Sequence, residues 1–524
     1  MAAVENKAEH GWRRIAYEII SDSNTPAVMT LALLIAACLP PRVGAAMTKT
    51  PTPLLASEQT VLTPDQMEED LDYVVRMLEN VHPATHRGFS EQQIATIDAA
   101  YQYAQEPMTT TRFYFLANTV ICSLQDAHTQ LRPMKGLLNR RIDVPISSLS
   151  DGFYVECDRE PFRRGDRIVA LGDKDIETIV REMRSLIPAE NEHWRRLGMA
   201  KKLQRHEFLN HLGVVESNAV DVGVERNATA ITLTAPLKLP ARVPRPAARP
   251  WVGHQVFPDL SLGLFYLDKC TVNDSYRKAL RSFFERVRDH DIRNVAIDVR
   301  QNGGGNSRVI DEFLRYLDIS RYRHFGGDIR YSKEVAAQRG YSRTSGYRRG
   351  KPHRARNRRI EDKSLLFDGK LFVLTSPATF SSGNWFAVII RDNDLGTVIG
   401  EPTGNAPSSY GDIATFQMPN TGFSFTVSHK RWARPNPDND PENALYPDIP
   451  VFTTIDDIIN GTDPQIEKLQ AVKSIRFSPQ AYTTYLNNAV ARIGLDGYES
   501  FYGALKTGKE ETVEHHIELQ PSSE

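Results

Sequence analysis

The alternation of strand-like and helix-like segments after residue 260 constrains the fold most strongly. Short apolar runs such as "LGLFYL" (262–267), "NVAIDV" (294–299) and "KLFVLT" (370–375) are separated by amphipathic stretches such as "DSYRKALRSFFERVRDH" (274–290). Buried strands that alternate with helices are typical of a sheet whose strands are joined by helical crossovers. We therefore predict that the C-terminal half of the chain forms a mixed α/β core.

A helical region precedes this core. The segment "TPDQMEEDLDYVVRMLENVHP" (63–83) has Thr63 as a helix cap, Pro64 in the first helical position and apolar residues at helical spacing. Helical patterns follow in residues 91–105 and 109–131. These three stretches predict a small helical domain.

The next region, residues 142–240, alternates as strands do, and "AVDVGVERNATAITLTAPL" (219–237) predicts a hairpin. A length of 524 residues predicts about two to four domains. We predict this division: an export segment at 1–47, a linker at 48–62, a helical N-terminal domain at 63–130, a β-rich segment at 131–240, a linker at 241–257, an α/β core at 258–475 and a C-terminal helical or tail segment at 476–524.

The composition argues against several classes of partner. The net charge of −1 gives no indication of binding to nucleic acid. The four cysteines (Cys38, Cys122, Cys157 and Cys270) are widely spaced and form no CxxC pair, which argues against a zinc site and a dense disulfide framework. One or two isolated disulfides remain open. We expect no metal and no cofactor.

The N-terminal residues predict export. Arg13 and Arg14 precede a short apolar run, "AVMTLALLIAACLPP" (27–41), which is typical of a secretory signal and short for a membrane span. Two alternatives are open: translation could begin at Met29, or "LIAAC" could act as a lipoprotein signal that acylates Cys38 and attaches the protein to a membrane. We expect an extracytoplasmic protein that is periplasmic, secreted or lipid-anchored.

Three motifs and one basic run each have a functional and a structural interpretation. Ser381 and Ser382 stand where an apolar strand gives way to a helix, so either one caps the helix or is a nucleophile beside its N-terminus. The turn in "AIDVRQNGGGNS" (296–307) either joins strand to helix or brings bare N–H groups to a ligand. His128 in "LQDAHTQL" is either structural or a base. The basic run at 339–359 is either a solvated, mobile loop or a cover over an acidic substrate.

The order of these and other motifs resembles the tail-specific (C-terminal processing) protease family of serine peptidases. The matching segments are "DAHT", "RGDRIVALG", "IDVRQNGGG", "ATFSSGNWFA", "GEPTGN" and "YPDIPV", and the resemblance spans about residues 63–470. It implies an α/β catalytic core like that of the crotonase and Clp protease group, preceded by the helical domain and a PDZ-like segment. It also implies hydrolysis of peptide bonds in protein or peptide substrates, with the oligomeric state left open.

The resemblance also implies roles for particular residues. Ser381 takes the place of the nucleophile, and the backbone N–H groups of Ser382 and Gly304 would form the oxyanion hole. The loop after "GEPT" lacks the lysine that one branch of the family uses as a base, and Lys430 is the nearest downstream lysine. The tricorn-type branch instead uses a histidine, which corresponds to His128.

In that branch a late carboxylate orients the histidine. The candidates are Asp438, Asp440 and Glu442, of which we favour Glu442. Ala127 stands where the tricorn-type pattern has serine, and Thr129 could take that role. Two alternatives to a peptidase remain open: a protein on the same fold that binds a hydrophobic ligand or a peptide without catalysis, and a degraded protease that acts as a scaffold.

Overall fold

The computed structural model describes residues 60–132, 140–239 and 249–471. The predictions for the export segment, for Cys38 and for residues 476–524 lie outside these ranges. No helix among the described residues is both long and apolar enough to cross a membrane. Cys122, Cys157 and Cys270 are free thiols, so the three described cysteines form no disulfide with one another.

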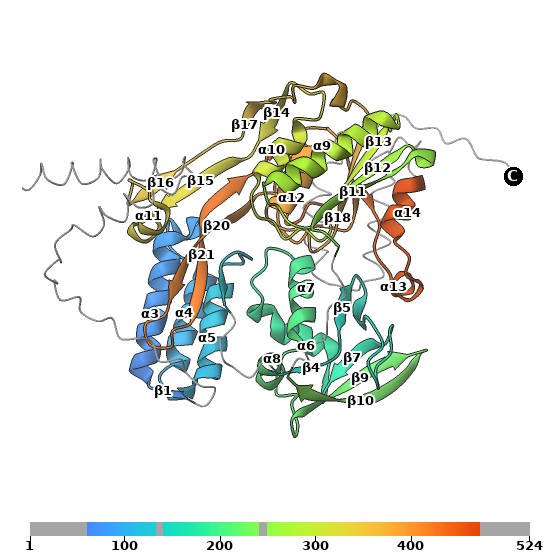
Figure 1. Cartoon of the computed structure of the whole chain (residues 1–524). Coiled ribbons are helices and arrows are strands. Elements are labelled where there is room, and N and C mark those ends of the chain that lie inside the picture. Colours follow the sequence, from blue (N-terminus) through green and yellow to red (C-terminus); the bar gives the residue numbers. More distant parts are fainter. Residues whose placement is uncertain (1–59, 133–139, 240–248, 472–524) are drawn as a thin grey trace, which may run out of the picture. The chain divides into compact units, whose positions relative to one another are not determined.

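Three helices form in the N-terminal region, and the third ends at Cys122, before the predicted end at residue 131. They are α3 (Pro64–Val81), α4 (Glu91–Tyr103) and α5 (Thr110–Cys122), shown in blue in Figure 1. Thr63 caps α3 through a capping box, in which its hydroxyl accepts from the Gln66 N–H and the Gln66 side chain accepts from the Thr63 N–H. The predicted linker ends in a strand, since β1 (Val61–Leu62) pairs with β2 (Met108–Thr109).

The β-rich region forms an antiparallel sheet in the order β4-β10-β9-β7-β6-β5, with β8 on β7. Its strands are β4 (Arg141–Ile142), β5 (Ile146–Leu149), β6 (Gly152–Val155), β7 (Arg167–Leu171), β8 (Lys174–Asp175), β9 (Ala219–Arg226) and β10 (Thr229–Lys238). The predicted hairpin is the β9–β10 pair. Between β8 and β9 lie three helices, α6 (Ile176–Met183), α7 (Glu192–Lys202) and α8 (His206–His211). Whether this region is PDZ-like stays a prediction, as do the domain boundaries.

The predicted α/β core is a six-stranded sheet in the order β11-β12-β13-β18-β19-β22. Its strands are β11 (Val252–Phe257), β12 (Leu262–Leu267), β13 (Asn294–Asp298), β18 (Lys370–Thr375), β19 (Thr397–Gly400) and β22 (Ile449–Pro450). The helices of this region are α9 (Asp274–Asp289), α10 (Arg308–Leu314), α12 (Ser382–Asp392), α13 (Ile455–Asn460) and α14 (Pro464–Ala471).

The direction of these strands positions the site. All neighbours run parallel except β11. Helices lie in the connections from β12 to β13, from β13 to β18 and from β18 to β19, as the alternation predicts, whereas β20 (Ser409–Gln417) and β21 (Ser424–Ala433) lie in the connection from β19 to β22. Because β13 and β18 pair in parallel, the glycine turn after Asp298 and the serine turn after Thr375 leave the sheet at the same edge. Ligands of such sheets bind at the carboxyl ends of the strands.

A third sheet connects the helical region to this edge. It has the order β16-β15-β21-β20, with β3 paired to β21. Its strands are β3 (Gln130–Leu131), β15 (Gly326–Tyr331), β16 (Gly346–Arg348), β20 (Ser409–Gln417) and β21 (Ser424–Ala433), and α11 (Lys333–Arg339) follows β15. β3 begins two residues after His128. Its pairing with Phe425 and Thr426 of β21 therefore fixes the position of the segment that carries the histidine.

Strands β14 (Arg321–His324) and β17 (His353–Arg356) form a separate two-stranded ribbon. The basic run at 339–359 is therefore not simply a loop, since it contains β16 and β17.

One buried ion pair joins the core helix α12 to the loop before β22. The Arg434 side chain is fully buried and contacts the equally buried Asp392 carboxylate through two hydrogen bonds of 3.0 and 2.8 Å. Arg434 Nη1 also donates to Glu442 at 2.6 Å. Removing one partner of a buried pair is costly because the remaining charge is left without compensation.

We therefore expect Arg434→Met to lower the free energy of unfolding by about 3–5 kcal/mol, because Asp392 is then buried without its cation. Denaturant titration followed by circular dichroism measures the change. The control is Arg277→Met, which breaks the exposed Arg277–Asp274 pair and should cost less than about 1 kcal/mol. Equal losses in the two variants would contradict the importance of the buried pair.

Candidate active site

Ser381 lies at the turn between β18 and α12 in a conformation that is rare for a residue with a side chain. Its φ is 54° and its ψ is −124°, and its side chain makes no capping hydrogen bond to α12. Its Oγ instead lies 3.1 Å from Nε2 of His128. Of the two interpretations of this serine, the structure excludes the cap. A strained strand-to-helix turn that exposes Oγ is the arrangement of a nucleophile elbow.

Ser382 has a different environment. Its Oγ donates a hydrogen bond of 2.8 Å to the carbonyl of Gly305, and the residue is buried. The side chain of Ser382 therefore holds the glycine turn against α12, and only Ser381 presents its hydroxyl to the histidine.

His128 lies between the end of α5 and the start of β3. Its backbone N–H donates to Asp126 Oδ1 at 2.9 Å, and its carbonyl accepts from Thr426 Oγ1 at 2.8 Å. The ring packs against Phe380, with 4.6 Å between the centroids. Burial lowers the pKa of the imidazole below its usual value, and the Asp126 charge only partly offsets this effect. His128 is therefore neutral at neutral pH, as a base must be.

Asp126 is the buried anchor of this segment. Its carboxylate accepts hydrogen bonds from His82 Nε2 at 3.1 Å and from Thr129 Oγ1 at 2.6 Å. Burial alone would raise the pKa of Asp126, but the hydrogen bond and charge of His82 outweigh this and hold that pKa well below its usual range. Thr129 thus contacts Asp126 and the Ser428 N–H, and among the described residues it makes no hydrogen bond to Ser381, so the structure does not give it the role suggested for it.

Asp126 Oδ1 also lies 3.8 Å from His128 Nδ1, the ring nitrogen that faces away from the serine. This is an ion-pair distance and is longer than a hydrogen bond. Among the described residues, Asp126 is the carboxylate at ion-pair distance from His128 Nδ1.

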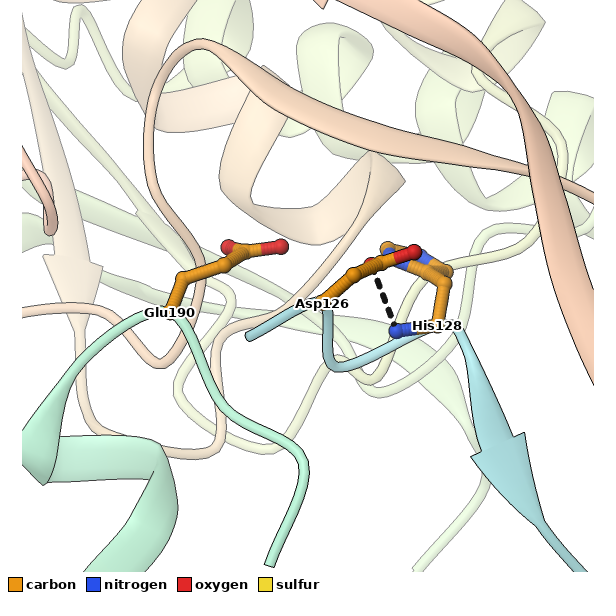
Figure 2. A group of neighbouring side chains, drawn as sticks. All are labelled: Asp126, His128 and Glu190. Carbon is orange, nitrogen blue, oxygen red and sulfur yellow. Dashed lines mark hydrogen bonds and ion pairs between the residues drawn. The ribbon is translucent and has the colours of Figure 1, made fainter. Parts of the chain in front are cut away.

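Glu190, which lies just before α7, reaches Asp126 and His128 from another part of the chain (Figure 2), with one carboxylate oxygen within 4.8 Å of a ring nitrogen of His128. Its Oε2 accepts from the Ala406 N–H at 2.8 Å and from the Asn405 side chain. Asn405 Oδ1 in turn accepts from the Ser381 N–H at 3.1 Å. Burial, together with the charge of Asp126, raises the pKa of Glu190 to about 8, so this carboxyl is largely protonated at neutral pH.

Asp126, His128 and Glu190 could also hold a metal ion, since one ligand atom from each lies within 4.8 Å of the others. His128 Nδ1 and Glu190 Oε1 are buried and have no hydrogen-bond partner among the described residues. Both Asp126 oxygens, however, already accept hydrogen bonds from protein groups. A cation at this position would therefore have to displace protein donors from Asp126.

The backbone N–H groups near Ser381 revise one prediction. The Gly304 N–H donates to Asn302 Oδ1 at 2.9 Å, so it is not free to bind an oxyanion. The Gly305 N–H and the Ser382 N–H have no acceptor among the described residues, and both residues line the cavity in front of Ser381. Gly304 still requires glycine, because its φ is 102° and a Cβ there would lie 2.6 Å from Ser381 Cβ.

The late carboxylates do not reach the histidine. Glu442 pairs with Arg434, and Asp440 Oδ2 accepts from Ser408 Oγ at 2.6 Å. Neither of these residues nor Asp438 has a hydrogen bond or ion pair with His128 among the described residues. The structure therefore does not bring Glu442 to the position predicted for it. A buried arginine attracts this carboxylate, and no sequence pattern in the loop marks that arginine.

The cavity in front of Ser381 has a volume of about 400 Å³. Its lining includes both members of the Ser381–His128 pair, Gly305, His324, Trp385, Trp432 and Lys430. Lys430 Nζ contacts Asp412 Oδ2 at 2.5 Å, and no hydrogen bond joins it to Ser381. A hydroxyl, a neutral imidazole and two free N–H groups around one cavity can perform acyl transfer.

Sequence reasoning missed three contributors to this site. Asp126 stands two residues before His128, and this spacing could have suggested that it anchors the histidine. Asn405 lies within the "GEPTGN" segment. Glu190 carries no local signal, because only the tertiary fold brings it to His128.

Known proteins resemble this chain in part of its sequence and in its fold. Residues 263–451 match the model of peptidase family S41. No curated protein matches the sequence. Two structures of mature CPAF share the fold: the complex with lactacystin has a TM-score of 0.60 at 14% identity, covering 78% of this chain and 98% of that chain, and the other has a TM-score of 0.57 at 14% identity, covering 78% and 96%. Residues 263–451 are therefore similar to the peptidase family S41 domain, and the chain is a serine peptidase.

Proposed function

We propose that this serine peptidase is an endopeptidase in which Ser381 is the nucleophile and His128 is the general base. The observation that carries the proposal is the 3.1 Å contact between Ser381 Oγ and His128 Nε2, made by a serine with a φ of 54°. A serine hydroxyl is a weak nucleophile until a neighbouring base takes its proton. The free N–H groups of Ser382 and Gly305 lie beside it.

The reaction follows from these positions. His128 Nε2 takes the proton from Ser381 Oγ, which attacks the carbonyl carbon of the peptide bond. The negative charge on the carbonyl oxygen is stabilised by the N–H groups of Ser382 and Gly305. The imidazolium then gives its proton to the leaving amine, and water releases the acyl group by the same steps in reverse.

Asp126 takes the orienting role that we predicted for Glu442. It holds the backbone of His128 at 2.9 Å and faces Nδ1 at 3.8 Å, where its charge stabilises the imidazolium that forms during the reaction. Because it acts through His128 and does not contact the substrate, Asp126 is a positioning residue.

Ser381→Ala should abolish labelling by a fluorophosphonate, because this reagent reacts with an activated serine. Ser382→Ala is the matched control and should keep most of the labelling, since its backbone N–H remains. Mass spectrometry of the labelled peptide identifies the modified residue. An adduct on Ser382, or undiminished labelling of Ser381→Ala, would exclude the assignment. Labelling of the wild-type protein together with cleavage of peptides by it would exclude the non-catalytic alternative.

The activity should fall on acidification with a midpoint below about 6.5, since His128 must be neutral to act and burial lowers its pKa. His128→Ala should lower kcat by about 10²–10⁴-fold. Lys430→Ala should keep the acid limb of the kcat/KM profile in place. An alkaline midpoint that disappears in Lys430→Ala, with normal turnover by His128→Ala, would instead assign the base to Lys430.

Asp126→Asn should lower kcat by about 10²-fold or more and move the acid limb to lower pH, because the imidazolium loses a stabilising charge. Glu442→Gln should leave the acid limb unchanged and reduce thermal stability, since it weakens the Arg434 pair. Steady-state kinetics across pH and thermal melts separate the two effects. A shifted acid limb in Glu442→Gln alone would restore the original prediction.

We also propose that the protein acts outside the cytoplasm, on the strength of the apolar run before Cys38. N-terminal sequencing and lipid analysis of natively expressed protein test this location. An intact N-terminus without lipid on Cys38 would contradict it.

A further inference from the structure

The outer face of the β14–β17 ribbon carries four arginines in two directly opposed pairs. The antiparallel register places Arg321 opposite Arg356 and Arg323 opposite Arg354. All four side chains are exposed, whereas Tyr322 between them is buried. We call these four residues the arginine ribbon; β14 and β17 lie side by side in Figure 1.

The arginine ribbon lacks compensating charge. Arg321, Arg354 and Arg356 have no side-chain hydrogen bond or ion pair with any residue that the structure describes. The guanidinium group of Arg323 donates only to the neutral side chain of Asn436, at 3.2 Å. Like charges directly opposite each other destabilise an antiparallel pair. Two such pairs in succession therefore hold positive charge that an anionic ligand would relieve.

The arginine ribbon lies on a strand whose last residue borders the active-site cavity from the opposite face of that strand. His324, the last residue of β14, lines that cavity together with Ser381 and His128. At the other end of the ribbon, a surface hollow is lined by Arg356, Arg358 and Lys363 among other residues. Arg358 is also exposed and has no side-chain partner among the described residues. Uncompensated positive charge thus extends along the ribbon, from Arg323 next to His324 to this hollow.

We infer that the arginine ribbon binds an acidic segment of the protein substrate, a short run of Asp and Glu residues on one side of the cleaved bond. The inference rests on the proposed endopeptidase function. Guanidinium groups pair with carboxylates through two parallel hydrogen bonds, and opposed strands offer them in two rows. Four strand residues span about 13 Å, which corresponds to roughly four residues of an extended peptide. Cleavage would therefore favour substrates whose acidic run lies close to the scissile bond.

A peptide is a better match than nucleic acid. The net charge of the chain is −1, and the positive charge on this surface lies on a ribbon whose strand β14 ends at a residue that lines the peptidase cavity. Proteins that bind nucleic acid through phosphates usually carry a wider basic surface and a basic overall balance.

Two fluorogenic peptides with the same cleavable core, one with a Glu-rich flank and one with a Gln-rich flank, test the inference. The wild-type enzyme should show a KM about tenfold lower for the Glu-flanked peptide at low salt, with similar kcat, and the preference should shrink as salt rises. The variant Arg321→Gln/Arg323→Gln/Arg354→Gln/Arg356→Gln should lose the preference and cleave the Gln-flanked peptide as the wild type does.

The chain offers a matched control. Arg141 and Lys238 form another exposed pair of like charges directly opposite each other, in the sheet formed by β4 and β10. Arg141→Gln/Lys238→Gln should retain the full preference. If the fourfold variant fails to fold, Arg354→Gln/Arg356→Gln is the substitute. It removes both arginines of β17, which is half of the charge of the arginine ribbon, and should lose about half of the preference on a logarithmic scale.

Binding of both peptides to Ser381→Ala, followed by fluorescence anisotropy, separates the two proposals. Preferential binding of the Glu-flanked peptide without cleavage by the wild type would leave the arginine ribbon in place and contradict the endopeptidase. Equal KM and equal binding for the two peptides, with normal cleavage, would overturn the arginine ribbon alone. Loss of preference in the control pair, or ribbon-dependent binding of a single-stranded oligonucleotide without discrimination between the peptides, would also overturn it.

Discussion

The contact between Ser381 Oγ and His128 Nε2 is the interaction on which the rest of the structure depends. The two residues are 253 positions apart, and they come from different parts of the fold. The serine leaves the parallel sheet at the end of β18, whereas the histidine follows the helical region. A distance of 3.1 Å between such elements requires that the sheet, the helices and the strands between them be rigidly joined.

The pairing of β3 with β21 provides that connection. β21 also pairs with β15 and β20, so the histidine segment becomes an edge of the sheet that borders the cavity. Buried Asp126 fixes the local turn through His82, Thr129 and the His128 N–H. On the other side, Asn405 holds the Ser381 N–H and connects it to Glu190. The strained backbone of Ser381 is thus held by neighbours on both sides, as strain at a functional site requires.

Local patterns predicted much of this architecture. Capping residues and helical spacing identified α3, and alternating apolar segments identified the crossover sheet, because these features depend on neighbours in sequence. The proximity of the glycine turn to Ser381 follows from the parallel pairing of β13 and β18. The orientation of individual peptide groups did not follow: Asn302 takes the Gly304 N–H, which leaves the Gly305 N–H toward the cavity. The positions of Glu442 and Glu190 did not follow either, because buried Arg434 binds the first and the fold before α7 places the second.

A crystal structure of the fluorophosphonate adduct tests the central claim most directly. The account predicts a covalent bond to Ser381 Oγ and a phosphonyl oxygen about 2.7–3.1 Å from the N–H groups of both Ser382 and Gly305. It also predicts that His128 Nε2 remains within hydrogen-bond distance of Ser381 Oγ. An adduct on Ser382, or an oxygen bound by the Gly304 N–H with His128 turned away, would contradict the assignment of nucleophile, base and oxyanion hole.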